Sequence, residues 1–293
     1  MTPISGILPA IITPFDEHEN FNPKAYEKLI EHLYSQGIDG LYVNGQTGEG
    51  LLQPVAQRKQ SAEVALRCSP KGKSVIVHVG AYRTADALEL ARHASSIGAH
   101  AVASLPPLGA YSFIEIKAFY QALAAVSELP VLVYYFPAVS PAIQAAAQVL
   151  ELLDIPNVIG LKFTDFDLYK MARMKQRGCV LFNGHDEVLI AGLLMGADGG
   201  IGSFYNLAPE LFVQAYNECK SGEWSRAQQT QQRINELIEI GLRFPMVPAM
   251  KTILRWKGID CGQCLQPRRA LTAQEEQDLR AALLASSHAH LAA

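Results

Sequence analysis

The segment Asn157-Val158-Ile159-Gly160-Leu161-Lys162-Phe163-Thr164-Asp165 joins an apolar run, typical of a buried strand, to a lysine near its end. A charged ammonium is costly to remove from water, so a lysine in such a place tends to lose its proton. A neutral amine is a nucleophile toward ketones and aldehydes. Alternatively, Lys162 reaches solvent or pairs with an acidic neighbour such as Asp165. This stretch alone leaves both interpretations open.

Similar short apolar runs recur on both sides of this segment and alternate with amphipathic, helix-like stretches. Strands are expected at 7–13, 40–44, 74–79, 101–105, 131–136, 158–163, 179–183 and 199–202. Helices are expected near 23–36, 54–67, 84–97, 112–127, 142–153, 167–175, 187–195 and 209–220. Alternating strands and helices predict a parallel sheet, and eight such units fit a closed α/β barrel of the (β/α)8, or TIM, type. An open doubly wound sheet is less favoured because no G-x-G-x-x-G follows the first strand.

Beyond residue 220 the pattern becomes purely helical, with helices expected at 225–242, 247–256 and 273–284. We therefore predict a barrel over residues 1–220 and a helical extension over 221–293 that packs on it as one structural unit. The extension could cap the barrel or pair with a partner chain. The last residues, from His288 to Ala293, are expected to be disordered, as chain ends often are.

The composition excludes several classes of protein. The 293 residues are 49% hydrophobic and 18% charged, with a formal net charge of -3 and no basic block, which argues against nucleic acid as a partner. The sequence has neither a signal peptide nor an apolar run long enough to span a bilayer, so no membrane contact and a cytoplasmic location are expected. Five scattered cysteines do not suggest a disulfide framework. The C-x-x-C from Cys261 to Cys264 is predicted to hold two free thiols, and no metal-ligand spacing is found.

In a TIM barrel, the chemistry lies at the carboxyl ends of the strands. The second strand ends in Asn44-Gly45-Gln46-Thr47-Gly48-Glu49-Gly50, where exposed N–H groups and a hydroxyl suit a carboxylate or phosphate, although a plain turn also fits. Tyr134 and Tyr135 follow each other on the fifth strand, so only one of them points into the barrel. Beside a neutral lysine, that tyrosine could move protons.

The seventh strand ends in Asn183-Gly184-His185-Asp186-Glu187. Acidic residues in a first helical turn often serve only as caps. At a barrel mouth, the same carboxylates would accept hydrogen bonds from sugar hydroxyls and repel a phosphate. The segment 199–203 resembles a barrel phosphate loop, but the neighbouring acids favour a polyol ligand.

Taken in chain order, these motifs resemble the N-acetylneuraminate lyase / dihydrodipicolinate synthase family of class I aldolases. The resemblance covers nearly the whole chain and rests on six segments: 6–7, 13–15, 45–49, Tyr134, 160–164 and 202–203. It implies that Lys162 forms a Schiff base, that Tyr134 shuttles protons and that Thr47 holds the substrate carboxylate. It further implies a homotetramer, built as a dimer of dimers, that needs neither cofactor nor metal. Substrate-binding positions implied by the resemblance are Gln46, Gly48, Thr164, Gly184, His185, Asp186, Glu187, Gly202 and Ser203.

The details favour sialic acid lyases within this family. Dihydrodipicolinate synthases carry an arginine after the tyrosine strand, where this chain has Val139, so a second substrate carboxylate would lose its bidentate partner. The lyases have a Pro-Ala-Leu-Ser/Thr segment there, close to residues 137–140, and an Asp-Glu pair that matches Asp186 and Glu187.

The expected reaction is cleavage of a 2-oxo acid to pyruvate and an aldehyde, with N-acetylneuraminate giving N-acetylmannosamine. Three departures from the lyases point to a reshaped pocket: Gln46 in place of a small hydroxyl residue, His185 where tyrosine is common, and a loop at 106–110 without its aromatic pair. A 2-keto-3-deoxy sugar acid aldolase or dehydratase is therefore the nearest alternative, followed by a 4-hydroxy-tetrahydrodipicolinate synthase. A barrel that binds a sugar acid without turning it over is the alternative from another class.

Overall fold

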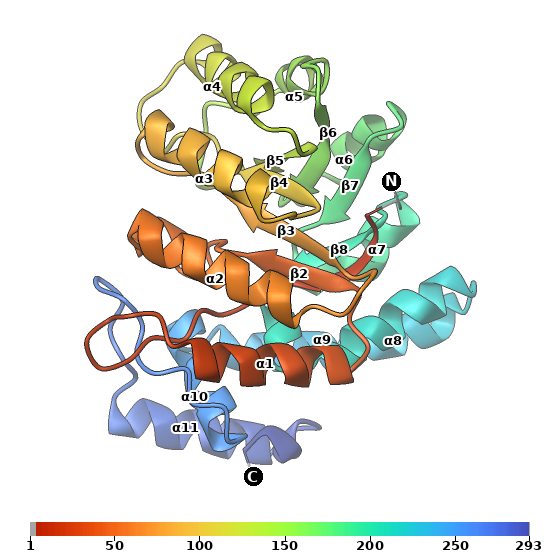
Figure 1. The fold of residues 1–293 in the computed structure, drawn as a ribbon. Helices are drawn as coiled ribbons and strands as arrows, with labels where there is room; N and C mark the ends of the chain where they lie inside the picture. The colour runs from red at the N-terminus through yellow and green to blue at the C-terminus, as the bar shows by residue number, and fades with distance from the viewer. Residues whose placement is uncertain (1–3, 293) are drawn as a thin grey trace.

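The computed structural model describes residues 4–292 and confirms the predicted barrel with its helical C-terminal part (Figure 1). Eight parallel strands follow the order β1-β8-β7-β6-β5-β4-β3-β2. Closure between the first and second strands is made by a parallel bridge from Ala10 to Tyr42, with the Ile11 N–H donating to the Tyr42 carbonyl at 3.0 Å. The strands are β1 (Gly6–Pro9), β2 (Gly40–Val43), β3 (Ser74–His78), β4 (Ala101–Ser104), β5 (Val131–Tyr135), β6 (Val158–Phe163), β7 (Val180–Asn183) and β8 (Gly199–Gly202).

The barrel helices surround the strands on the outside, as Figure 1 shows for α1 to α4. Their bounds are α1 (Pro23–Ser35), α2 (Val55–Cys68), α3 (Thr84–Ser96), α4 (Phe113–Val126), α5 (Ala146–Leu153), α6 (Leu168–Lys175), α7 (Leu189–Leu194) and α8 (Pro209–Lys220). Local signals fix several of these starts. The side chain of Asn22 accepts a hydrogen bond from the Ala25 N–H at 3.2 Å, and Ser112 with Glu115 forms a capping box.

Three predicted boundaries were wrong in ways that bear on the site. The first strand ends at Pro9 rather than 13, because the Ile12 N–H donates to the Asn206 side chain at 3.1 Å instead of to a strand. Helix α5 begins four residues later than expected, at Ala146. Helix α7 begins at Leu189, because Asp186–Val188 forms a separate 3-10 turn (η2).

Two apolar layers hold the barrel together. One fills its interior and includes Leu8, Tyr42, Ile76, Leu132 and Phe182, all buried. The other lies between strands and helices and contains the alternate strand residues. This period of two decides which side chains can meet inside the barrel.

Three further helices, α9 (Trp224–Gly241), α10 (Met246–Trp256) and α11 (Ala273–Leu284), follow the last barrel helix. The expected disorder at the C-terminus was wrong for the residues that the structure describes. Leu291 is 3% exposed, and the His288 ring nitrogen Nε2 lies 2.8 Å from the carbonyl of Arg233 on α9. The Arg280 side chain of α11 donates to the Ala292 carbonyl at 3.0 Å. Burial of the Leu291 side chain therefore orders this end of the chain.

The buried end predicts a specific stability loss. Leu291→Ala should lower the free energy of unfolding by about 2–4 kcal/mol, since a buried leucine loses both its transfer energy and its packing. Leu284→Ala is the matched control, because Leu284 is 58% exposed on the neighbouring helix and should change stability little. Equilibrium denaturation in guanidinium chloride measures both. Equal effects of the two substitutions would contradict the docked C-terminus.

Candidate active site

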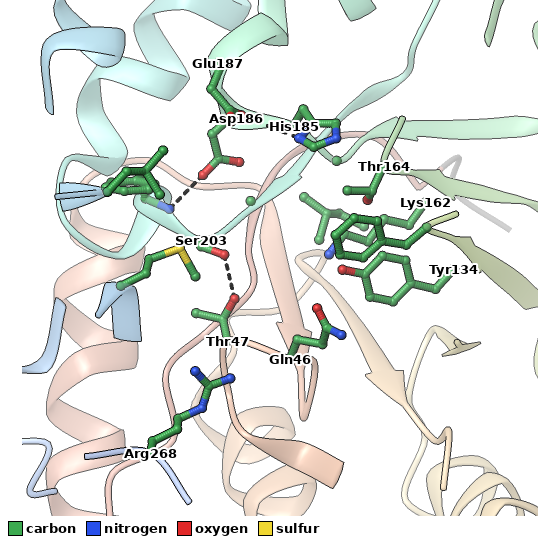
Figure 2. A pocket seen from close by; sticks show the side chains of 17 residues that line it. Gln46, Thr47, Tyr134, Lys162, Thr164, His185, Asp186, Glu187, Ser203 and Arg268 are labelled. Carbon is green, nitrogen blue, oxygen red and sulfur yellow. Dashed lines mark hydrogen bonds and ion pairs between the residues drawn. The ribbon is translucent and has the colours of Figure 1, made fainter. Parts of the chain in front are cut away.

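A cavity of about 230 Å³ opens at the carboxyl ends of the barrel strands (Figure 2). Its wall contains eleven of the twelve residues predicted as the site: Gln46, Thr47, Tyr134, Lys162, Thr164, Gly184, His185, Asp186, Glu187, Gly202 and Ser203. Gly48 is the exception. A Cβ at this position would lie 2.8 Å from the carbonyl oxygen of Ile11, so Gly48 allows close packing of the turn behind the cavity.

Lys162 and Tyr134 meet because they occupy paired positions on β6 and β5. In-register neighbours on parallel strands point to the same side of the sheet, here into the barrel. The Lys162 Nζ atom lies 4.0 Å from the centre of the Tyr134 ring and 4.8 Å from that of Tyr42. Lys162 is 5% exposed, so its amine does not reach solvent.

Burial lowers the pKa of Lys162 to about 7, and the nearby carboxylate of Asp186 opposes this shift only in part. A large share of the amine is therefore neutral near neutral pH. The alternative partner, Asp165, is engaged elsewhere, because its Oδ2 accepts from Lys170 at 2.9 Å. The structure thus removes both simpler interpretations of this lysine.

The two tyrosines of β5 have different environments, as the strand period predicted. Burial raises the pKa of Tyr134, so its phenol is neutral at rest. The Tyr135 hydroxyl lies on the outer side and donates to Asp165 at 3.2 Å, while Lys170 donates to it at 3.0 Å. Only Tyr134 is placed to exchange protons with a ligand on Lys162.

A hydrogen bond between Thr47 and Ser203 connects the second and eighth strand ends. Their hydroxyl oxygens are 2.6 Å apart (Figure 2). Two hydroxyls that share one hydrogen bond keep one hydrogen to donate to a ligand. Gln46 precedes Thr47 and also lines the cavity. This arrangement can bind an anionic or hydroxyl group next to the lysine.

Asp186 forms the acidic wall and is 5% exposed. Its Oδ2 accepts from the Phe204 N–H at 2.8 Å, and burial raises its pKa to about 7, with Glu187 adding to the rise. A Cβ at Gly202 would lie 1.8 Å from the Asp186 Oδ1, so only glycine fits there. The Gln231 amide of α9 fixes the same turn by donating to the Asp186 carbonyl at 3.0 Å.

Glu187 and His185 form the outer part of this wall. The His185 ring stacks on Phe166 with centres 3.9 Å apart, and its Nδ1 lies 3.6 Å from the Glu187 Oε2. Contact with His185 lowers the pKa of Glu187, which therefore stays ionised. The buried hydroxyl of Thr164 makes no hydrogen bond of normal geometry within residues 4–292, but it lies close enough to the Tyr134 phenol to oppose the rise in the pKa of that phenol. These groups suit a polar, hydroxyl-bearing molecule.

Sequence reasoning missed six lining residues: Phe136, Ile201, Phe204, Leu242, Met246 and Arg268. The first three adjoin residues that were singled out, so the strand-end rule could have found them. Leu242 and Met246 flank the junction of α9 and α10, and Arg268 lies between α10 and α11. No local pattern marks these three, because only the three-dimensional packing of the C-terminal part brings them to the barrel mouth.

Residues 4–292 contain no group of three or more His, Cys, Asp or Glu side chains arranged to hold a metal ion. In the same range, no helix has the length and apolar character needed to cross a membrane. All five cysteines are free, and burial raises the pKa of both Cys261 and Cys264 to about 12, which makes them poor nucleophiles.

Comparison with known proteins shows similarity along nearly the whole chain. The family model described as the dihydrodipicolinate synthetase family matches residues 3–286. The N-acetylneuraminate lyase of Rhizobium meliloti is 35% identical over 282 residues, which cover 95% of this chain and 93% of the relative. The sialic acid aldolase of Ruminococcus gnavus superposes with a TM-score of 0.91 at 28% identity, covering 98% of this chain and 96% of that one.

The structure of CdNal from Clostridium difficile in complex with mannosamine gives a TM-score of 0.92 at 28% identity, over 97% of this chain and 100% of that one. Sequence and fold therefore agree with these proteins along nearly the full length of the chain. The chain belongs to the dihydrodipicolinate synthetase family.

Proposed function

We propose that this protein is a class I aldolase that cleaves N-acetylneuraminate to N-acetylmannosamine and pyruvate through an imine on Lys162. The observation that carries the proposal is the buried Lys162 amine, whose pKa burial lowers to about 7, lying 4.0 Å from the centre of the Tyr134 ring inside the cavity. The similar proteins named N-acetylneuraminate lyase and sialic acid aldolase support the substrate. A site that only bound the sugar acid would gain nothing from a desolvated amine next to a proton donor.

The first half of the mechanism builds the imine. The neutral amine of Lys162 attacks the ketone carbon C2 of the substrate and forms a carbinolamine. The Tyr134 phenol gives its proton to the carbinolamine hydroxyl, which leaves as water. The products of this step are an iminium cation and a phenolate. The faces of the Tyr42 and Tyr134 rings, 4.8 and 4.0 Å from the nitrogen, favour a cation at this position.

The second half breaks the carbon–carbon bond. The phenolate takes the proton of the C4 hydroxyl, the C3–C4 electron pair moves toward the iminium, and the aldehyde leaves. The enamine that remains is protonated at C3 by the phenol. Water then adds to the iminium and releases pyruvate, which restores the amine. The lysine itself provides the electron sink throughout.

The rest of the cavity would hold the two ends of the substrate. Thr47 and Gln46 would bind the carboxylate end. The carboxylates of Asp186 and Glu187 would accept hydrogen bonds from the substrate hydroxyls, and the Ser203 hydroxyl could donate or accept one. Val139 packs against the apolar barrel interior. It stands at the position where the family resemblance places the arginine of dihydrodipicolinate synthases. The chain therefore offers no guanidinium there for a second carboxylate.

We also propose that the protein works as a homotetramer, a dimer of dimers, in the cytoplasm. The family resemblance is the basis for this assembly, and large apolar side chains on the surface, such as Tyr169 (75% exposed) and Ile114 (78% exposed), are candidates for burial in it. Light scattering coupled to gel filtration measures the mass in solution, and a monomeric mass at assay concentrations would contradict the proposed assembly.

Imine trapping tests the proposed function. Borohydride with pyruvate should add a three-carbon group to Lys162, and Lys162→Ala should prevent this while the fold persists. Tyr134→Phe should lower turnover of N-acetylneuraminate by roughly 10²- to 10⁴-fold, since proton transfer is lost, yet still allow slow trapping. Peptide mass spectrometry locates the adduct, and a coupled assay for pyruvate measures turnover.

Two controls sharpen this experiment. Tyr135→Phe should leave turnover nearly unchanged because Tyr135 faces away from the cavity. Lys170 should remain unmodified, since contacts with Tyr135 and Asp165 raise its pKa and keep it protonated. Absence of any Lys162 adduct at saturating pyruvate would sink the proposal. Faster turnover of a 2-keto-3-deoxy sugar acid than of N-acetylneuraminate would retain the chemistry and change the substrate.

The lowered pKa of Lys162 predicts how trapping depends on pH. The rate should rise with pH as the amine loses its proton, with a midpoint near about 7. Asp186→Asn should move this midpoint to lower pH, because the Asp186 carboxylate favours the ammonium. Asp165→Asn is the control, since Asp165 pairs with Lys170 outside the barrel and should not move it. A wild-type midpoint near the ordinary lysine value would show that Lys162 is not desolvated.

A further inference from the structure

Arg268 is the one residue from the segment between α10 and α11 that lines the cavity. Figure 2 shows its guanidinium directed toward the turn that carries Gln46 and Thr47. Within residues 4–292 this guanidinium donates no hydrogen bond; its buried Nε lies 3.8 Å from the Glu49 carboxylate, and the side chain as a whole is 38% exposed. A cation with unused donors at a cavity wall calls for an anionic ligand.

The positive charge of Arg268 is not fully neutralised by its neighbours. Glu49, whose side chain is 0% exposed, forms an ion pair with the 3% exposed side chain of Lys251 at 2.9 Å. The Arg268 Nε lies 3.8 Å from the other carboxylate oxygen, Oε2, which already accepts from the Leu265 N–H at 2.8 Å. One carboxylate thus faces two cations. Lys251 neutralises Glu49 at close range, and the charge of Arg268 remains available at the cavity.

The same buried pair fixes where Arg268 stands. Glu49 ends the Gln46–Glu49 turn in a left-handed conformation, with φ 57°. Lys251 on α10 also donates to the Gln263 carbonyl at 2.8 Å. The strand-two turn and the segment that carries Arg268 are therefore held to each other by a desolvated ion pair. Its rigidity would keep the guanidinium beside Gln46 at little entropic cost on binding.

The cavity is consequently polarised. Figure 2 shows Asp186 and Glu187 at one end of the lining and Arg268 at the other, with the Thr47–Ser203 hydrogen bond between them. A 2-oxo acid has one anionic end. The acidic wall repels that end, and Arg268 attracts it.

We propose that Arg268, with the Gln46 amide beside it, binds the carboxylate of the 2-oxo acid and so orients the substrate on Lys162. This inference rests on the proposed function and names a specificity-determining residue for it. The neutral hydrogen-bond donors of Thr47 and Gln46 orient the substrate carboxylate, and the Arg268 guanidinium supplies the positive charge that attracts it. The hydroxyl-bearing part of the substrate is thereby directed toward Asp186 and Glu187.

The test measures how imine trapping depends on ketone concentration. Arg268→Met should raise the half-saturating concentration of pyruvate by roughly tenfold or more, since a charge-assisted hydrogen bond is lost, while trapping at saturation persists. Pyruvamide, the uncharged amide of pyruvate, should be trapped with the same half-saturation by the wild type and by Arg268→Met. Arg269→Met is the matched control, because Arg269 pairs with Glu275 on the surface at 2.7 Å.

The outcomes separate the two proposals. If the wild type forms no adduct at any pyruvate concentration, the proposed function fails. If the wild type is trapped and Arg268→Met needs no more pyruvate than the wild type, only the role of Arg268 is overturned. Equal losses for pyruvate and pyruvamide would also overturn it, because a structural effect does not distinguish the carboxylate.

A second variant, Arg268→Lys, distinguishes loss of charge from misfolding of Arg268→Met. Arg268→Lys keeps the charge but loses the planar fork, so its half-saturation for pyruvate should lie between those of the wild type and Arg268→Met. Raising the ionic strength should weaken pyruvate binding in the wild type and in Arg268→Lys. A half-saturation that does not respond to salt in either protein would contradict a charge-based role.

Discussion

The in-register pairing of β5 with β6 is the constraint on which the site depends. It sets Tyr134 and Lys162 side by side and turns both into a closed barrel. Inside the barrel an ammonium is largely removed from bulk water, so the amine gives up its proton more readily. A shift of one residue in this pairing would send one of the two side chains to the outer layer. Reactivity here follows from strand register rather than from any unusual residue.

The buried charges around the lysine form a second constraint. Lys162 and Asp186 both titrate near 7, from opposite directions, because burial disfavours the charged form of each. Each charge would stabilise the other, so proton gain or loss at one site affects the other. The absence of a Cβ at Gly202 is what allows Asp186 to come this close to the strand. A cation formed on Lys162 would therefore lower the pKa of Asp186 and favour its ionised form.

Much of the barrel and of this site could be predicted from the sequence, for a physical reason. Strand period and strand ends are local patterns, and in a parallel barrel all strand ends meet at one mouth. Thr47, Tyr134, Lys162 and Asp186 were found in this way. Gly48 does not line the cavity, and the sequence could not show this because a glycine in a turn looks the same whether it faces a ligand or packs against a carbonyl such as that of Ile11. The ordered C-terminus was missed because burial of Leu291 depends on a pocket formed by distant helices.

The C-terminal helices explain why the rest of the site could not be predicted. Leu242, Met246 and Arg268 have no periodic or strand-end signal, and they reach the mouth only through packing. The ion pair between Glu49 and Lys251 joins two segments about 200 residues apart in sequence, a separation at which local patterns carry no information. A buried ion pair contributes little net stability, because desolvation offsets its attraction. It fixes the strand-two turn against α10, while hydrogen bonds from the Leu265 N–H to Glu49 and from Lys251 to the Gln263 carbonyl hold the segment that carries Arg268 beside that turn. In the proposed function the barrel would supply the reactive lysine, and the segment between α10 and α11 would orient the substrate beside it.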